Sequence, residues 1–321
     1  MTTTETTPFY IPVAKPGASS SSANTLFQGA TLLIPAVSIG SVPQLTVDLL
    51  LQSDDLALKK VGRLDPSFCV PFVGAQEPSP AHHGSTGLCT ALEVFANDQG
   101  LVVIQQRSPV LKSLESEYIA ALTTWIGSVG IDQVLWVTSL DAGARIDSEL
   151  HTPVLSLLPN TTSAAPPTSS SSSSTSKSAP IVDRVRTAFP TFSPPSHDHE
   201  YARGAAATDN SSSYATDVPY IPGSLVTRKL LRHLNASSAN TPLKFQFAAI
   251  LYFSAEGDTR PDAHLLASLI TRDILSLPLH TIADNNNSND ADADADGQLV
   301  WKEPPSWNSL FGPPPSSDLY G

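Results

Sequence analysis

Short apolar runs, separated by polar and Gly-containing turns, recur along much of the chain. The runs "TLLIPAVSIG" from Thr31, "IDQVLWVTSL" from Ile131 and "KFQFAAILYFS" from Lys244 are nearly continuous, which is typical of strands buried on both faces. Two further β-rich runs, "CTALEVFAN" and "LVVIQQRS", are joined at residues 98–100, a length that indicates a hairpin. The pattern therefore predicts several buried strands, two of them paired antiparallel.

Helical spacing of apolar residues follows several of these strands. Ser41, Ser108 and Ser224 stand where an N-cap is expected, and Pro261 begins a fourth helix that Pro278 ends. The apolar stripes of the last three helices are Leu111, Leu114, Tyr118, Leu122, Trp125 and Ile126; Val226, Leu230 and Leu234; and Leu266, Ile270, Ile274 and Leu277. Because strands alternate with helices of this length, the sequence predicts a layered α/β fold, whose sheet the hairpin makes mixed.

Several tracts are too polar or too simple in composition to form a packed core. Serine, threonine and proline dominate much of 160–217, and asparagine and aspartate dominate 284–297. Ordering such residues costs conformational entropy that no buried side chain offsets. We therefore expect disordered insertions at about 160–217 and 284–297, a disordered N-terminal tail at 1–25 and a flexible Pro-rich tail at 313–321. The remainder of 26–312 leaves roughly two hundred foldable residues, the size of a single domain.

The formal net charge is −12, and lysine and arginine do not cluster in the sequence. Nucleic-acid binding depends on clustered basic side chains that release counterions, so no nucleic-acid partner is expected. No apolar run approaches the roughly 20 residues that cross a bilayer, and the start "MTTTETTPFY" lacks the basic and apolar regions of a signal peptide. We expect no membrane partner and a location in the cytoplasm and nucleus.

Candidate metal ligands and reactive thiols are few. Cys69 and Cys89 lie in apolar stretches without a secretory context, which favours reduced, buried thiols over a disulfide. The cluster "HDHE" at His197–Glu200 lies among Pro and Ser residues, where no scaffold would fix the ligand geometry. His82 and His83 are adjacent and are expected to diverge in a solvated loop. We therefore predict neither a metal site nor a cofactor site.

The motifs that many α/β enzymes require are missing from the sequence. There is no G-x-S-x-G, no G-x-x-x-x-G-K-[ST], and no G-x-G-x-x-G after the first strand. Glu256, Asp258 and Asp262 surround the turn before the helix at Pro261. Capping of this helix by Asp258 or Thr259 explains these residues better than acid/base catalysis, because no base is nearby. No catalytic residue is predicted.

Taken together, the stretches "TLLIPAVSIGSVPQLTVDLLL", "FVGAQE", "IPGSLVTRKLL", "EGDTRPDA" and "PPSWNSLFG" resemble the proteasome assembly chaperone 2 family, in order along nearly all of the foldable chain. The resemblance implies a three-layer α/β/α sandwich with a mixed central sheet, related to the phosphorylase-like fold, and no enzymatic activity. It also implies a heterodimer with proteasome assembly chaperone 1 that binds the outer face of the proteasome α-ring. Such a heterodimer promotes assembly of the α-ring and core particle and blocks premature or off-pathway association.

The chain ends in a hydrophobic residue, a tyrosine and one further residue, Leu319, Tyr320 and Gly321. Proteins that dock on the α-ring often end in this pattern. The resemblance therefore implies that these three residues enter a pocket between α subunits, in the region of the fifth to seventh. Leu319 and Tyr320 would bury apolar surface there, and Pro313–Pro315 would stiffen the approach. In the alternative, Tyr320 packs back on its own sheet.

Two other functions fit the same pattern of strands and helices. A phosphorylase- or hydrolase-like enzyme would share the layered fold, since fold does not fix function, and it would turn over a nucleoside or an ester. A general adaptor would bind unrelated partners through its disordered insertions. Removing residues 160–180 would abolish binding by such an adaptor, whereas a chaperone that works through its folded body would tolerate the loss.

Overall fold

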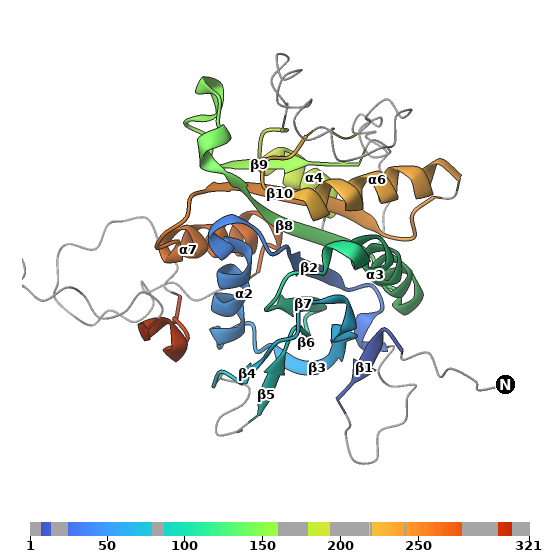
Figure 1. The fold of residues 1–321 in the computed structure, drawn as a ribbon. Helices are drawn as coiled ribbons and strands as arrows, with labels where there is room; N and C mark the ends of the chain where they lie inside the picture. Colours follow the sequence, from blue (N-terminus) through green and yellow to red (C-terminus); the bar gives the residue numbers. More distant parts are fainter. Residues whose placement is uncertain are drawn as a thin grey trace, which may run out of the picture.

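An eight-stranded mixed sheet forms the centre of the protein in a computed structural model of the chain (Figure 1). The structure describes residues 8–13, 25–78, 87–159, 179–192, 218, 220–240, 242–277 and 301–309. The order of strands across the sheet is β1-β3-β6-β7-β2-β8-β10-β9. Their bounds are β1 Tyr10–Pro12, β2 Thr31–Pro35, β3 Lys59–Leu64, β6 Leu92–Ala96, β7 Leu101–Gln106, β8 Gln133–Asp141, β9 Val154–Leu157 and β10 Gln246–Ser254. Strands β7, β2, β8 and β10 are parallel and the other neighbouring pairs are antiparallel, which confirms the predicted mixed sheet.

The central strands β2, β8 and β10 are buried on both faces. Along β8, Val134 and Trp136 pack into one core, whereas Leu135 and Val137 pack into the other. Because successive side chains of a strand point to opposite faces, a strand between two cores needs a continuous apolar run. The three nearly continuous runs of the sequence are confirmed as these strands, and β6 and β7 form the predicted antiparallel hairpin.

Helices cover both faces of the sheet, which gives the molecule three layers (Figure 1). One face carries α2 (Val42–Gln52), α4 (Ile181–Ala188), α7 (Arg260–Leu269) and the π-helical turn η8 (Ile270–Ile274). The other face carries α3 (Glu115–Val129) and α6 (Leu225–Asn240). The buried residues of the predicted stripes are Tyr118, Leu122, Trp125, Ile126, Leu230, Leu234, Leu266, Ile270 and Ile274. Within the described ranges, no helix combines the length and apolar character that crossing a membrane requires.

Two predicted helix starts differ in detail from the structure. Ser108 does not cap α3, because its Oγ donates to the carbonyl of Val70 at 2.7 Å and a 3-10 turn, Lys112–Leu114, precedes the helix. Ser41 precedes α2 as predicted, but it has a left-handed backbone (φ 53°) and makes no side-chain capping hydrogen bond. Pro43 lies in the first turn of α2, where its missing N–H costs no helical hydrogen bond.

The prediction of a disordered N-terminal tail is wrong at Tyr10–Pro12, which form the edge strand β1. The ring of Tyr10 lies 5.3 Å from that of Phe27 in an edge-to-face arrangement and 5.7 Å from that of Trp125. Its hydroxyl donates to the carbonyl of Val61 at 3.0 Å. Burial of aromatic surface thus orders a short strand whose neighbours in the sequence are mostly polar.

The prediction of a disordered insertion at about 160–217 is wrong for helix α4. Ile181 and Val185 of this helix are fully buried in the core on the α2 side of the sheet. Arg184, between them, donates to the carbonyl of Ile274 at 2.5 Å. Burial of one apolar face and the hydrogen bond of Arg184 therefore hold this two-turn helix in place between tracts of low complexity.

A small second sheet stands apart from the main one. Strand β4 (Val73–Ala75) pairs antiparallel with β5 (Leu88–Thr90). The single strand predicted from "CTALEVFAN" is therefore divided, since its first residues form β5 and β6 begins at Leu92. At the break, the backbone N–H of Thr90 donates to Glu93 Oε1 at 3.0 Å. Neither this hairpin nor the strands β3 and β9 follow from the apolar pattern of the sequence.

Candidate functional site

The carboxyl ends of the parallel strands are the usual ligand-binding edge of an α/β sheet. Here the loop after β2 is bonded to β8 and to the segment after β10. Ser38 Oγ accepts a hydrogen bond from the backbone N–H of Ser139 at 2.8 Å, and Thr259 Oγ1 donates to the carbonyl of Gly40 at 2.5 Å. A Cβ at Gly40 would lie 2.7 Å from Thr259 Cγ2. The connecting segments therefore contact one another directly, and the Thr259 side chain does not cap α7.

The carboxylates near this edge are bonded to neighbouring groups. Asp262 accepts hydrogen bonds from the Tyr252 hydroxyl at 2.9 Å and from Ser254 Oγ at 3.2 Å. Asp258 accepts from the backbone N–H of Arg260, the first residue of α7, at 3.2 Å and from its Nε at 2.8 Å. These hydrogen bonds lower the pKa of Asp258 to about 2. The capping role predicted for Asp258 is confirmed, and both carboxylates serve local structure.

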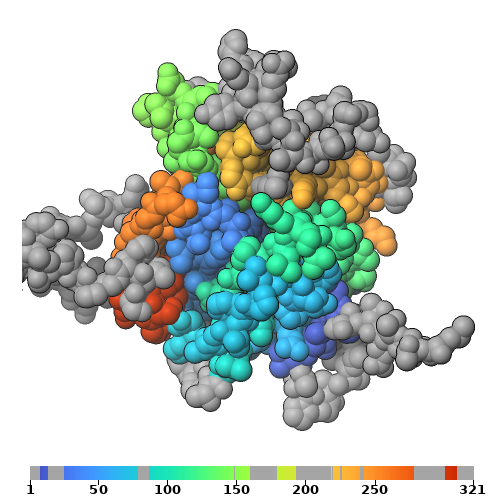
Figure 2. Space-filling view, in the orientation of Figure 1, coloured from blue at the N-terminus to red at the C-terminus, as the bar shows by residue number. Residues whose placement is uncertain are grey.

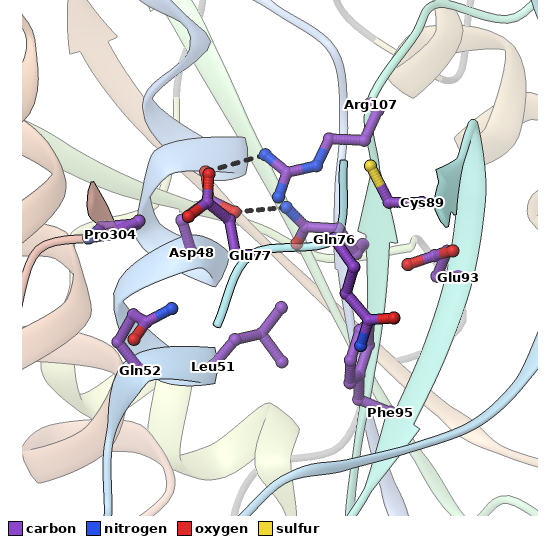
Figure 3. Close-up of a pocket in the computed structure, with 11 residues that line it drawn as sticks. Asp48, Leu51, Gln52, Gln76, Glu77, Cys89, Glu93, Phe95, Arg107 and Pro304 are labelled. Carbon is purple, nitrogen blue, oxygen red and sulfur yellow. Dashed lines mark hydrogen bonds and ion pairs between the residues drawn. The ribbon is translucent and has the colours of Figure 1, made fainter. Parts of the chain in front are cut away.

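A buried polar cluster lies between α2 and the end of β7 (Figure 3). Asp48, on α2, is 5% exposed, and its Oδ2 lies 2.9 Å from Arg107 Nη1. The side-chain amide of Gln105 donates to Oδ1 of the same carboxylate. Burial raises the pKa of Asp48, while the charge of Arg107 acts in the opposite direction. A lone carboxylate would be costly at this depth, so Asp48 depends on its hydrogen-bonding partners.

Glu93 and Cys89 line the opposite wall of the small pocket beside this cluster (Figure 3). Glu93 is buried, and its Oε1 lies 2.5 Å from Lys60 Nζ. The Cys89 thiol donates to the carbonyl of Ala75 at 3.4 Å, and burial raises the pKa of this thiol. A raised thiol pKa disfavours the nucleophilic thiolate. The pocket thus combines paired charges with an unactivated thiol, an arrangement suited to holding segments together.

The last described segment, residues 301–309, packs beside the same cluster. Trp301 Nε1 donates to Ser268 Oγ on α7 at 2.9 Å. Trp307 is 3% exposed, and its side chain forms a hydrogen bond with Asp48 that lowers the pKa of the carboxyl. Two indoles therefore fix where the remainder of the chain leaves the described body, next to α2 and α7.

The site residues predicted from the sequence, Leu319, Tyr320 and Gly321, lie outside the described ranges. So do His82, His83 and His197–Glu200, for which the sequence predicts no metal site. Cys69 and Cys89 are described, and both are free and buried, as predicted. In the part of the chain that the structure describes, no three His, Cys, Asp or Glu side chains are grouped as a metal site requires. The insertion at 284–297, the tail at 313–321 and the other domain boundaries stay predictions.

Reasoning from the sequence missed the pairing of Asp48 with Arg107. A signal was present, because Asp48 is a lone charge within the apolar stretch "TVDLLL" and Arg107 directly follows a buried strand. A charge in a buried element requires a partner. The two residues are 59 apart in the chain, and one sequence does not reveal which distant charge provides that partner.

Comparison with known proteins agrees with the resemblance noted from the sequence. A model of the PAC2 family matches residues 32–236, more than half of the chain. Proteasome assembly chaperone 2 of Danio rerio is 28% identical over 296 residues, which cover 92% of this chain and 96% of the relative. Proteasome assembly chaperone 2 of Homo sapiens is 29% identical over 286 residues, which cover 88% of this chain and 92% of the relative.

A solved structure shares the architecture. The monoclinic crystal form of Pyrococcus furiosus PbaA, described as an archaeal homolog of proteasome-assembly chaperone, gives a TM-score of 0.51 at 12% sequence identity. The match covers 79% of this chain and 80% of PbaA. At this identity the likeness concerns the fold alone, and the expected relation to the phosphorylase-like fold stays a prediction. Since the family model extends from β2 into α6, across most of the layered body, the chain belongs to the PAC2 family.

Proposed function

We propose that this chain is a proteasome assembly chaperone that works as a heterodimer with proteasome assembly chaperone 1. The heterodimer binds the outer face of the proteasome α-ring in the cytoplasm and nucleus, promotes assembly of the α-ring and core particle, and blocks premature association. One observation carries the proposal: relatives named proteasome assembly chaperone 2 align with 88% to 92% of this chain. An alignment of this extent spans most of the layered body.

The polar groups of the body support a binding role over catalysis. The loops at the carboxyl edge of the parallel strands are bonded to one another, through Ser38 and Thr259 among others. In the small pocket, Asp48 and Glu93 are each paired with a basic side chain, and the Cys89 thiol has a raised pKa. A general base or nucleophile needs a free lone pair and a pKa near the working pH.

In this proposal, Leu319, Tyr320 and Gly321 bind a pocket between α subunits, near the fifth to seventh. Leucine and tyrosine supply apolar surface, and the phenol hydroxyl supplies a hydrogen bond at the pocket wall. Because Trp307 is held against α2, Leu319 reaches at most about 40 Å from it, at roughly 3.3 Å per residue. The tail then acts together with a second contact on the body, and such tethering raises affinity by roughly 10²- to 10⁴-fold.

Affinity purification followed by mass spectrometry tests this division of labour. The baits are the full chain, a chain without Leu319–Gly321, and a control without Ser316–Asp318, which loses the same length but keeps the final three residues. We expect the full chain and the control to recover proteasome assembly chaperone 1 and α subunits. The chain without Leu319–Gly321 should keep the partner chaperone and lose most α subunits.

Two results would contradict the proposal in different ways. Loss of the partner chaperone from the bait without Leu319–Gly321 would show that the tail serves dimer formation. Recovery of neither α subunits nor partner by the full chain would overturn the assembly role itself.

A further inference from the structure

Exposed apolar side chains are concentrated on the small hairpin of β4 and β5 and on the residues that lead into it. Val73 and Leu88 are each 67% exposed, and Val70 and Phe72 are 42% and 40% exposed. The other exposed large apolar residues of the described ranges are scattered singly, at Val13, Leu150 and Leu265. Figure 2 shows the hairpin, in cyan to teal, at the lower edge of the molecule. Single exposed apolar residues are ordinary on a protein surface, whereas four within one short segment are not. Phe72 lies on the face of Gly74 and Cys89, and Val73 and Leu88 lie on the other face.

The register of the hairpin places its exposed residues on one face. Ala75 lies opposite Leu88, and Val73 lies opposite Thr90. Because directly opposed residues of an antiparallel pair share a face, Val73, Ala75 and Leu88 form one apolar strip. Residues 70–76 contain no charged side chain. The strip is therefore continuous and uncharged along β4.

The hydrogen bonds of the hairpin show which backbone groups point outward. The N–H of Gln76 donates to the carbonyl of Gly87 at 2.9 Å, so these two residues form a hydrogen-bonded pair. Hydrogen-bonded and non-hydrogen-bonded pairs alternate along antiparallel strands. By this alternation, the backbone groups of Val73 and the N–H of Ala75 point toward the outer edge of β4, whereas the Ala75 carbonyl accepts from the Cys89 thiol of β5.

The outward backbone groups at the two edges of the hairpin differ in their hydrogen bonding. On β5, the outward carbonyl of Leu88 accepts from Lys60 Nζ at 3.3 Å, and the outward N–H of Thr90 donates to Glu93 Oε1 at 3.0 Å. Across the described residues, β4 pairs with β5 alone, and apart from the Ala75 carbonyl, which accepts from the Cys89 thiol at 3.4 Å, the outward groups of Val73 and Ala75 make no hydrogen bond. Natural edge strands are usually protected by charges, Pro or a covering segment. The edge of β5 has such charges, and the edge of β4 does not.

We propose that the outer edge of β4 is a docking site for an extended, uncharged, apolar segment of a partner polypeptide. The segment would add as a strand, bonding to the outward N–H and C=O of Val73 and the N–H of Ala75 and packing alternate apolar side chains on the strip with Leu88. The open donors and acceptors require a strand, and the uncharged strip requires apolar side chains on it. This inference rests on the proposed function, in which the partner is the second chaperone of the heterodimer.

Two variants separate the side-chain contribution from the backbone contribution. Val73→Asp places a short charge in the apolar strip, where a docked segment would bury it. Ala75→Pro removes one outward N–H and leaves the pairing with β5 intact, because Pro is tolerated where the N–H faces away from the sheet. Leu150→Asp is the matched control, since Leu150 is 56% exposed and lies outside the hairpin. Thermal unfolding of each variant checks that the fold is retained.

The measurement is the Kd of each purified variant for purified proteasome assembly chaperone 1. We expect Val73→Asp and Ala75→Pro to weaken binding by roughly tenfold or more, with no change for Leu150→Asp. Hydrogen exchange provides a second readout, in which the amides of Val73 and Ala75 exchange rapidly in the isolated chain and slowly in the heterodimer.

Each contrary result would overturn the inference and would show which part of it is wrong. Wild-type affinity in both hairpin variants would leave the proposed function standing and remove β4 from the interface. Slow exchange in the isolated, monomeric chain would mean that another segment of the same chain covers the edge. A dimer of the isolated chain that Ala75→Pro dissociates would make a second copy the occupant. Absence of binding by the unmodified chain would overturn the heterodimer and this inference together.

Discussion

At the carboxyl ends of β2, β8 and β10, the connecting segments are hydrogen-bonded to one another. Around β4 and β5, in contrast, charged side chains are paired in the interior, and backbone groups are left open at the outer edge of β4. The first region corresponds to the place where α/β enzymes hold substrates. In this protein, Ser38 is hydrogen-bonded there to Ser139, and Gly40 is hydrogen-bonded to Thr259. The second region has buried charges behind an uncharged apolar strip. The difference indicates that the capacity for new contacts lies at the small β4–β5 sheet, and not at the carboxyl ends of the parallel strands.

The largest expected effect on stability comes from the pair behind the hairpin. Asp48→Ala leaves Arg107 without its carboxylate in a largely buried position, which should lower the free energy of unfolding by about 3 kcal/mol. This is the lower end of the range for a broken buried pair, because 24% of the Arg107 side chain remains exposed. Chemical denaturation followed by tryptophan fluorescence gives the value.

The matched control for Asp48 is an exposed ion pair. Asp183 lies 3.2 Å from Arg186, with 57% and 35% of the two side chains exposed. Asp183→Ala should therefore change the free energy of unfolding by less than ~0.5 kcal/mol. Equal effects of the two substitutions would contradict the view that the Asp48 pair holds α2 and β7 together.

A smaller effect is expected at the carboxyl edge. Gly40 has φ 66°, and a Cβ there would lie 2.7 Å from Thr259 Cγ2 and 2.8 Å from Ser254 Oγ. Gly40→Ala should therefore cost about 2 kcal/mol of unfolding free energy, from backbone strain and from displacement of these side chains.

Gly100 separates the two contributions at Gly40. It has a similar φ of 81°, and a Cβ there would meet nothing within 4 Å. Gly100→Ala should cost about 1 kcal/mol, from backbone strain alone. If both alanine variants unfold at the same denaturant concentration, the loops at the carboxyl edge are less tightly packed than the structure indicates, and the comparison between the two regions weakens.

The central layers could be predicted from the sequence because their physical signal is local. Strands β8 and β10 lie between two cores, so nearly every residue is apolar. Helix α7 and the following turn η8 repeat apolar residues at Leu266, Ile270 and Ile274. Burial on one or both faces thus leaves a periodic trace in the chain itself.

The elements that were missed depend on distant partners. β1 is ordered by contacts of Tyr10 with Phe27 and Trp125, and α4 by burial of Ile181 and Val185 between tracts of low complexity. The open edge of β4 follows from a pairing register, which the apolar pattern of "VPFVGA" alone does not encode. The predicted site at the end of the chain rests on the resemblance, since no contact of the described residues bears on it.

The most direct test of the central claim is native mass spectrometry of the purified heterodimer mixed with purified proteasome core particle. We expect a species whose mass equals the core particle plus bound heterodimer, and we expect this species to be lost when Leu319–Gly321 are removed. A heterodimer that remains free at every concentration, with its tail intact, would contradict the claim that this chain acts on the α-ring.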